Sequence, residues 1–464
     1  MRNFLPTTAE ELKLSAFQTD RAGHRVGVYG YGVVGRAVVE LLQRESVSSL
    51  RVIDGNTELE HPELENVQWC LGELCQSWLE DLDVLFIGPG VEPRHPLLIH
   101  ARERGLLIVG ELALLGNLPA DLIAITGTNG KSTTTAWAGF ILSDLKISSF
   151  VGGNLGDPIT GWALRDYEAK LGVLELSSYQ LETAYGFAPR VSVITNLAPD
   201  HASRYESNLE YYKAKSRIFY SQHETAVCIL REDVSSELDS LPNCETWTFG
   251  DNVSAHGFIA SEGNWCGEGI FDGITLPWHG LAIPGRHNAE NALCAVLSVW
   301  AIRGRIDALE GLWEIAGRFA GLEHRLEFVS EHNQIRFYND SKATNDESAA
   351  TALEALKGPV VWLAGGVSKG AGYKASMRFL RDKVRHLIVF GAAAAEIRDE
   401  AIAHGFPASS ITEALSLLDA VNCVTAVAHP GDEVLLSPAC ASFDEFKSFE
   451  ERGAFFKEKV LELH

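Results

Sequence analysis

The residues whose types and spacing most clearly indicate chemistry lie between Ile123 and Thr133. An apolar run leads into the loop Gly127-Thr128-Asn129-Gly130, which is followed by Lys131-Ser132-Thr133. Glycines let backbone N–H groups turn inward around phosphate oxygens, and a helix that begins at the loop adds its dipole. The lysine supplies a mobile positive charge, and the serine hydroxyl can ligate Mg²⁺. We therefore predict a nucleotide-phosphate site between a strand and a helix; a plain glycine turn is the alternative.

Three side chains further along can complete such a site. Glu175 follows the apolar run Leu171–Leu174, which we predict to be a strand parallel to the one that feeds the loop, so its carboxylate can share the Mg²⁺ with Ser132. His201 closes the next predicted strand and is interpreted as a second metal ligand, although a lone histidine is more often a capping or core residue. Lys215 reads, from its local sequence, as one charge on a solvated helix face.

An earlier glycine turn, Gly30-Tyr31-Gly32-Val33-Val34-Gly35, follows a predicted strand and opens a helix. Asp54 ends the next predicted strand. This pattern is typical of a dinucleotide site whose acidic residue meets a ribose hydroxyl. It indicates a nucleotide diphosphate near a helix N-terminus more firmly than a nicotinamide, and a structural turn between strand and helix remains an alternative.

Polar groups also follow two predicted strands near the end of the chain. Arg325 and the string Asn339–Asn345 can serve the ribose and phosphates of a nucleotide, although a turn rich in Asn, Asp and Ser has the same composition. Ser437–Asp444 offers small residues and hydroxyls suited to a carboxylate at a helix start. Cys440 has no histidine nearby in sequence to activate it as a nucleophile.

The elements that must position these residues alternate between strand and helix, which predicts an α/β fold in three blocks. The predicted strands, grouped by block, are 25–29, 50–54, 84–87 and 106–109; 123–126, 171–174 and 191–194; and 336–338, 360–364, 387–390 and 433–436. The stretch Glu232–Gly280 is interpreted as β-rich or loop excursions of the second block, which ends with a helix around Asn288–Ala301 and a shorter one after it.

Length and composition narrow the class of protein. The 464 residues are too many for one core and predict two or three domains. A formal net charge of −23 argues against non-specific binding of nucleic acid or anionic membranes. Eight cysteines without a C-x-x-C pair, no apolar leader and no membrane-length apolar run lead us to expect a reduced, cytoplasmic protein.

Taken together, these motifs resemble the Mur ligase superfamily, and within it the D-glutamate-adding branch, over nearly the whole chain. The phosphate loop 127–133 is similar to the ATP loop of these ligases. The strings 339–345 and 437–453 are similar to signatures of the D-glutamate-adding branch, and Gly88-Pro89-Gly90 with His95-Pro96 fits its first domain. The segment before Arg25 is an extension relative to the family, and the glycines around Lys369 match its pattern only approximately.

The resemblance implies a role for each candidate residue. The residues implied to bind ATP are Gly127, Thr128, Asn129, Gly130, Lys131, Ser132, Thr133, Asn288, Arg325, Asp340 and Lys342. Those implied to hold the UDP-substrate are Val33, Val34, Asp54, Gly88, Gly90 and Asn154, and those implied to position glutamate are Thr344, Lys369, Ser442 and Phe449. The implied ligands of two Mg²⁺ ions are Ser132, Glu175, His201 and Lys215, with Lys215 carbamylated. The implied catalytic set is Lys131, Glu175, His201, Lys215 and Arg325.

The resemblance also implies three domains: a Rossmann-like domain over residues 1–110, a P-loop ATPase-like domain over 111–321 and a second Rossmann-like domain over 322–464. The implied activity is ligation of D-glutamate to UDP-N-acetylmuramoyl-L-alanine with ATP, in a cytoplasmic monomer that uses neither nucleic acid nor membrane. Four alternatives stay open. They are another ligase of the superfamily, such as a folylpolyglutamate synthase, a variant that uses L-glutamate, an NAD-dependent oxidoreductase, and a nucleotide-binding protein without catalysis.

Overall fold

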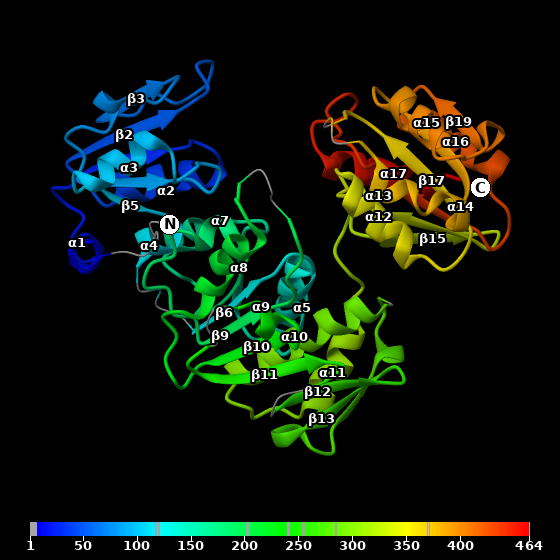
Figure 1. The fold of residues 1–464 in the computed structure, drawn as a ribbon, viewed down its shortest axis with the longest axis horizontal. Helices are drawn as coiled ribbons and strands as arrows, with labels where there is room; N and C mark the ends of the chain where they lie inside the picture. Colours follow the sequence, from blue (N-terminus) through cyan, green and yellow to red (C-terminus); the bar gives the residue numbers. More distant parts are fainter. Residues whose placement is uncertain are drawn as a thin grey trace. The chain divides into compact units, whose positions relative to one another are not determined.

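The computed structural model describes residues 7–116, 118, 121–200, 204–238, 242–252, 256–283, 285–368, 370 and 372–463. The chain forms two compact units, Met1–Phe319 and Ala320–His464. Three parallel-rich sheets, each with helices against it, make up these units (Figure 1). The predicted α/β class is therefore confirmed. No helix of the described residues is long and apolar enough to cross a membrane.

The first sheet is entirely parallel and has the strand order β3-β2-β1-β4-β5. Its strands are β1 (Arg25–Tyr29), β2 (Ser49–Asp54), β3 (Val67–Leu71), β4 (Val84–Ile87) and β5 (Leu107–Val109). Its helices are α2 (Val33–Arg44) and α3 (Pro96–Glu103). Strands β2 and β3 are added on one side of β1, and strands β4 and β5 are added on its other side. The crevice between β1 and β4 is thus a topological switch point, where open α/β sheets bind ligands.

The segment before Arg25 is built into this first part of the fold. Helix α1 (Thr8–Thr19) begins with a capping box at Thr7 and buries Leu14 and Phe17. The Gln18 Nε2 donates to the Ala113 carbonyl at 2.6 Å, so the helix also touches the segment that leads into the next sheet. The extension therefore covers apolar surface rather than standing apart from the fold.

The second sheet has nine strands in the order β14-β13-β12-β11-β10-β9-β6-β8-β7. They are β6 (Asp121–Thr126), β7 (Ser149–Gly153), β8 (Leu171–Glu175), β9 (Val191–Ile194), β10 (Val227–Arg231), β11 (Glu245–Gly250), β12 (Gly257–Ser261), β13 (Asn264–Glu268) and β14 (Thr275–Pro277). Only the β12–β13 and β13–β14 pairs are antiparallel. The stretch predicted as β-rich or loop therefore extends this sheet as the strands β11 to β14.

The helices of the second sheet bring its functional loops into place. They are α4 (Glu111–Leu115), α5 (Lys131–Asp144), α6 (Ile159–Leu164), α7 (Ser178–Leu181), α8 (Asn208–Ser216), α9 (Val234–Glu237), α10 (Arg286–Ile302) and α11 (Leu309–Gly317). Helix α2 of the first sheet packs on α6, and one apolar cluster runs from β1 and β2 into β6 and β8. The first and second sheets therefore share a continuous core within one unit.

The C-terminal unit has one six-stranded sheet in the order β15-β16-β20-β17-β18-β19. Its strands are β15 (Glu327–His332), β16 (Ile335–Asn339), β17 (Val360–Gly365), β18 (Val384–Phe390), β19 (Ile411–Ala414) and β20 (Glu433–Leu436), and its helices are α12 (Asp346–Ala355), α13 (Lys374–Met377), α14 (Leu380–Lys383), α15 (Ala394–Ala403), α16 (Leu417–Val427) and α17 (Phe449–Leu461). Only the edge strand β15 is antiparallel to its neighbour. Alternate residues of β17 enter different apolar clusters, Trp362 one and Leu363 the other, so both faces are covered.

Candidate active site

The phosphate loop connects β6 to α5, and two of its glycines have backbones that other residues rarely adopt. Gly127 has φ 148° and Gly130 has φ 81°. A Cβ at Gly127 would lie 2.0 Å from the Thr195 Oγ1, and one at Gly130 would lie 2.2 Å from the Asn291 Oδ1. Both glycines are thus required by backbone conformation and by close approach. Helix α5 begins at Lys131, and no side chain caps its N-terminus. The first N–H groups of this helix are therefore directed toward the phosphate loop.

Two lysines converge on one carbonyl of this loop. The Lys131 Nζ donates to the Gly127 and Thr128 carbonyls, each at 2.9 Å, and the Lys215 Nζ donates to the Gly127 carbonyl at 2.7 Å. Lys215 is only 1% exposed, and its Nζ lies 4.6 Å from the ring centroid of Tyr211. The interpretation of Lys215 as a solvated charge is therefore wrong, because α8 turns this side chain inward against the loop.

The surroundings of Lys215 disfavour its charged form. Burial, and then the nearby Lys131 ammonium, lower the pKa of Lys215 well below its usual value, while Asp200 and Glu175 oppose this effect. Lys215 is therefore a desolvated amine beside a phosphate-type loop, which is unusual for a lysine.

Glu175 ends β8, which pairs in parallel with the strand that feeds the loop, as predicted. Its Oε1 accepts a hydrogen bond from the Asn154 Nδ2 at 2.7 Å. Its Oε2 is buried and has no hydrogen-bond partner among the described residues. Such an oxygen fits a divalent cation, which Mg²⁺ sites commonly hold through one or two carboxylates plus substrate phosphates.

The remaining candidates for metal binding give a partial set. Ser132, in the first turn of α5, is buried at 4% exposure. His201 lies outside the described residues. Within the described parts of the chain, no group of three or more His, Cys, Asp and Glu side chains could hold a metal ion. Among the described residues, the candidate oxygen donors are the Ser132 hydroxyl and the Glu175 carboxylate.

Three residues to which the sequence assigned no role in the loop brace it. The Thr195 Oγ1 donates to the Asn129 carbonyl at 2.6 Å, and the Asn196 Oδ1 accepts from the Asn129 N at 2.9 Å. The Tyr211 Oη donates to the Thr128 Oγ1 at 3.3 Å. Because the end of β9 and helix α8 both hold the loop, its shape is set by residues about 70 to 80 positions away.

Helix α10 closes the other side of the phosphate loop. Asn288 lies in its first turn, and Asn291 follows one turn later. The Asn291 Oδ1 accepts from the Thr134 Oγ1 at 3.3 Å, besides lying against Gly130. The predicted residue Asn288 therefore lies on an element that contacts the phosphate loop directly.

The glycine turn of the first sheet lies at the switch point. Gly30 has φ 98°, and a Cβ at Gly35 would lie 1.9 Å from the Gly30 carbonyl oxygen. The Gly88 N donates to the Tyr29 carbonyl at 2.9 Å, which places the glycines after β1 and β4 side by side. The carboxylate of Asp54 accepts backbone hydrogen bonds from Tyr31 at 2.8 Å and Asn56 at 2.9 Å. Asp54 thus holds the turn itself.

The other candidates of this region lie next to the turn. Val33 is 71% exposed at the start of α2, Val34 is half-buried, and Gly90 lies just beyond β4. Asn154 instead follows β7 and contacts Glu175, so it belongs to the phosphate-loop group. The structure thus brings Val33, Asp54, Gly88 and Gly90 to one edge of the first sheet.

In the C-terminal unit, Asp340 follows β16 and Ser437 follows the neighbouring strand β20. The Ser437 Oγ donates to the Asp340 Oδ2 at 2.7 Å, and the Leu326 N donates to the Asp340 Oδ1 at 3.1 Å. Burial raises the pKa of Asp340 to about 7, although the two hydrogen bonds and the Arg325 charge favour its ionised form. Arg325 lies between two residues with positive φ, His324 and Leu326, in the turn that leads to β15.

Arg452, on helix α17, ties the segments of this unit together. It is 1% exposed, and its guanidinium donates to the Ser341 Oγ at 2.9 Å, the Ser341 carbonyl at 2.8 Å and the Cys440 carbonyl at 3.1 Å. Desolvation lowers the pKa of Arg452 to about 10. Sequence reasoning included this residue only as part of a tail motif and gave it no role.

Three further predicted residues of this unit, Ser442, Phe449 and Thr344, lie on the segments that Arg452 ties together. Ser442 is 2% exposed beside the bridge between Val367 and Ala441. Phe449 begins α17; its carbonyl accepts from the Ser341 Oγ at 2.8 Å, and its ring lies 5.3 Å from the Lys342 Nζ. Thr344 follows the same turn as Lys342, and Lys369 lies outside the described residues. The described candidates of each unit therefore lie near the carboxyl ends of the strands of that unit.

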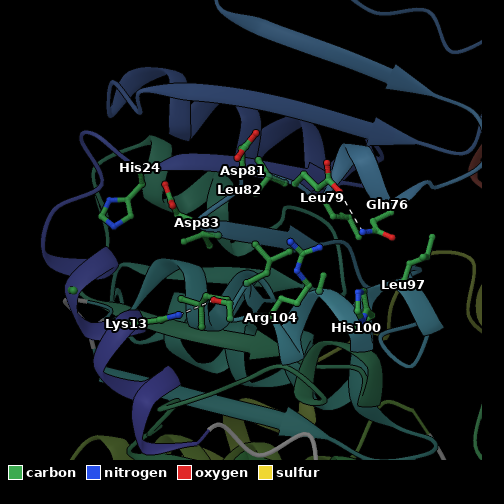
Figure 2. Close-up of a pocket in the computed structure, with 17 residues that line it drawn as sticks. Lys13, His24, Gln76, Leu79, Asp81, Leu82, Asp83, Leu97, His100 and Arg104 are labelled. Carbon is green, nitrogen blue, oxygen red and sulfur yellow. Dashed lines mark hydrogen bonds between the residues drawn. The ribbon is translucent and has the colours of Figure 1, made fainter.

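A separate cavity lies away from these residues. A pocket of about 360 Å³ is lined by Lys13, His24, Asp83 and Arg104, among others (Figure 2). His24 precedes β1 and Asp83 precedes β4, so the pocket lies at the amino ends of the first sheet. Open α/β sheets bind ligands at the opposite edge. This pocket is therefore separate from the candidate site.

Family comparisons agree with the motifs. The N-terminal domain model of MurD-like Mur ligases matches residues 24–110, the Mur ligase middle domain matches 125–299, and the glutamate ligase domain of Mur ligases matches 324–440. Over 95% of its length, the chain is 36% identical to the UDP-N-acetylmuramoylalanine–D-glutamate ligase of Caldanaerobacter subterraneus subsp. tengcongensis, covering 98% of that protein. The enzyme of the same name from Lachnospira eligens is 34% identical over 96% of this chain and is covered completely.

The chain therefore belongs to the Mur ligase family and is a ligase with its three-domain α/β architecture. Within that family, the chain is similar over nearly its full length to enzymes named UDP-N-acetylmuramoylalanine–D-glutamate ligase. A third example, from Pelotomaculum thermopropionicum, is 36% identical and covers 95% of this chain and 98% of its own length.

Solved structures show the same fold at low sequence identity. The UDP-N-acetylmuramate–alanine ligase MurC of Thermotoga maritima has a TM-score of 0.56 and 17% identity, covering 95% of this chain and 100% of its own. The MurF ligase of Thermotoga maritima in complex with ADP has a TM-score of 0.56 and 16% identity, covering 96% of this chain and 97% of its own.

Proposed function

We propose that this ligase joins D-glutamate to UDP-N-acetylmuramoyl-L-alanine, with ATP hydrolysed to ADP and phosphate, in the synthesis of peptidoglycan precursors. The names of its full-length relatives support the substrates. The observation that carries the chemistry is the convergence of Lys131 and Lys215 on the Gly127 carbonyl, beside a carboxylate whose Oε2 has no described partner.

In the proposed mechanism the phosphate loop binds the ATP phosphates through its backbone N–H groups and Lys131. To reach a phosphate, Lys131 exchanges its two carbonyl acceptors for phosphate oxygens. Mg²⁺, when bound by Ser132 and Glu175 with His201 and Lys215 at a second site, would neutralise charge on the transferring phosphoryl group. Arg325, Asp340, Lys342 and Asn288 are proposed to complete the nucleotide site.

We propose that Lys215 is carbamylated in the active enzyme. Carbamylation needs the neutral amine, whose nitrogen adds to the carbon of CO₂ and loses a proton to leave an anionic carbamate. Burial beside Lys131 favours this neutral form, as the lowered pKa of Lys215 indicates. The product would replace a buried neutral amine with an anionic group whose oxygens can ligate a cation.

The UDP-substrate and D-glutamate are assigned mainly to the carboxyl edges of the first sheet and of the C-terminal sheet. Val33, Val34, Asp54, Gly88 and Gly90 are proposed to hold the UDP moiety, and Asn154 to reach the rest of that substrate. In the C-terminal unit, Thr344, Lys369, Ser442 and Phe449 are proposed to position D-glutamate. This unit supplies buried hydroxyls and a helix start, which suit a dicarboxylate.

The bond-forming steps follow from this assignment. The L-alanyl carboxylate attacks the γ-phosphorus of ATP, which gives an acyl phosphate and ADP. The neutral amine of glutamate then attacks the acyl carbon, and the tetrahedral intermediate expels phosphate. A proton must leave the amine during this step, and solvent or a basic side chain takes it. His201 is a candidate for this base only in a state in which it does not ligate the metal.

The finer organisation of the enzyme is also part of the proposal. We assign the domains to residues 1–110, 111–321 and 322–464, and we propose a cytoplasmic monomer that binds neither nucleic acid nor membrane. The net charge of −23 supports the part of this proposal that excludes nucleic acid and anionic membrane surfaces.

The experiment that tests the function is Mg²⁺-dependent release of phosphate from ATP with UDP-N-acetylmuramoyl-L-alanine. D-glutamate, L-glutamate and no amino acid are compared, with Lys131→Ala as the inactive control. Release with D-glutamate alone is the expected result. Release with L-glutamate alone would change the proposed amino acid. No release with any of the three from folded protein would favour a folate acceptor and move the chain to another branch of the superfamily.

A further inference from the structure

A network of charged side chains joins the first and second sheets of the N-terminal unit. From the first sheet, Arg94 lies in the loop between β4 and α3. Its Nε is 2.8 Å from the Glu92 Oε1, its Nη1 is 3.6 Å from the Glu210 Oε2, and its Nη2 is 3.9 Å from the Glu182 Oε1. The Nη2 also donates to the Arg204 carbonyl. One arginine of the first sheet thus reaches three separate segments around the second.

Arg204 is the buried member of this network. Its Nη2 donates to the Glu182 Oε2 at 2.6 Å, and the two side chains are 9% and 10% exposed. Its guanidinium lies 4.3 Å from the ring centroid of Tyr179, and its Nε is 3.6 Å from the Glu92 Oε2. Breaking a buried pair of this kind leaves a charge without compensation, so the pair strongly prefers one geometry.

The network connects the loop proposed to hold the substrate with the segments that carry the catalytic candidates. Arg94 follows Gly90 by four residues, and Glu182 caps helix α7, which begins three residues after Glu175. Tyr205, next to Arg204, packs against Tyr211 with ring centroids 5.3 Å apart. Tyr211 in turn contacts Thr128 of the phosphate loop and the Lys215 Nζ. The contacts are continuous from one site to the other.

We propose that Arg94, Glu182 and Arg204 are positioning residues that set the distance between the UDP-substrate loop and the phosphate loop. This inference rests on the proposed function, because it assumes that the carboxylate of one substrate must reach the γ-phosphate of the other. We assign none of the three to the reacting atoms themselves. Their loss should therefore reduce turnover of bound substrates, since a displacement of about 1 Å can cost on the order of a hundredfold in rate.

Arg94 is the residue to change, because it is half-buried and its loss need not unfold the chain. We expect Arg94→Ala to lower kcat about tenfold to a hundredfold, while KM for the UDP-substrate changes less than about threefold. Arg94→Lys keeps the charge but not the planar fork, so it should recover part of kcat.

The matched control is Arg190→Ala. Arg190 forms an exposed ion pair of 2.8 Å with Asp121 in the same unit, but at the amino ends of β6 and β9, away from the candidate site. Its kcat should stay within about twofold of the wild type. A kcat of Arg94→Ala within twofold of the wild type, or a raised KM at unchanged kcat, would overturn the inference.

Hydrogen exchange of the ligand-free protein separates this inference from the proposed function. Arg94→Ala should speed amide exchange in the segment 205–215 at least about tenfold, and Arg190→Ala should not. Unchanged exchange would overturn the network whatever the reaction is. An inactive wild type with accelerated exchange in Arg94→Ala would instead reject the proposed function and keep the physical link.

Discussion

The carboxyl ends of the second and third sheets each hold a buried ionisable group, and the two groups make an instructive pair. Lys215 lies against the phosphate loop, and Asp340 lies between β16 and β20 of the C-terminal unit. Burial is the largest cause of the pKa shift in both, and it pushes both toward their neutral forms. The neighbours differ, because Lys131 adds to the effect at Lys215 whereas Arg325 opposes it at Asp340.

In both residues burial sets the direction of the pKa shift. The neighbouring charges then strengthen or oppose that shift, and so determine what chemistry each group can perform. The like charge of Lys131 favours a neutral amine at Lys215, which suits covalent conversion by CO₂. The opposite charge and the hydrogen bonds at Asp340 leave its pKa at about 7, so this carboxyl titrates near neutrality. Four predictions test the two halves of this comparison.

The largest effect should follow removal of the Lys131 side chain, whose ammonium donates to two carbonyls of the phosphate loop. We expect Lys131→Ala to lower kcat/KM for ATP about a thousandfold, because the phosphates lose their mobile charge. Steady-state phosphate release measures this loss. Thermal unfolding of the variant should stay close to that of the wild type, and a loss of less than about tenfold would contradict the assigned role.

The next prediction concerns Lys215 itself. Lys215→Met should lower kcat about a hundredfold, because the anionic ligand formed from the amine is lost. In ¹³C NMR with labelled bicarbonate, the wild type should show a carbamate signal that the variant lacks. Lys213→Met on the same helix should retain both signal and activity. No carbamate signal in an active wild type would reject carbamylation.

A smaller effect is expected at Asp340. We predict that activity of the wild type declines as pH falls through about 7, because the protonated carboxyl is a poorer acceptor for the nucleotide. Asp340→Asn should raise KM for ATP about tenfold and flatten this acid limb. A pH–rate profile of both proteins makes the comparison. An acid limb that persists unchanged in the variant would assign the titration to another group.

The smallest effect is on stability. The pKa of Asp340 is raised from 3.8 to about 7 in the folded state, so folding binds a proton between these values. Below about pH 4, Asp340 is protonated in both states and does not change the free energy of unfolding. Between about pH 4 and pH 7 its ionisation favours the unfolded state, so the free energy of unfolding falls as pH rises. Above about pH 7 this destabilisation is complete and constant. Asp340→Asn should raise the unfolding midpoint of the C-terminal unit relative to the wild type more at pH 8 than at pH 5. An equal difference at both values would contradict this linkage.

The sequence predicted most of the strands that carry site residues. The runs ending at Thr126, Ile194 and Leu436 are observed as β6, β9 and β20 with the loops where they were expected. Strands such as β3, β15 and β19 were missed, since their exposed polar positions interrupt the apolar pattern. Strand β7 ends in two glycines and was missed as well.

By itself, the sequence determined the family, the phosphate loop and the order of the main elements, because these depend on residues close together in the chain. It could not show that Lys215 is buried. Helix α8 also buries its two tyrosines, and only the packing of the loop and strand ends around it decides which face is inward. The Arg94–Glu182–Arg204 network and the buried Arg452 likewise arise from segments about 20 to 110 residues apart. Burial and charge pairing are properties of the assembled sheets, so tertiary structure alone decided them.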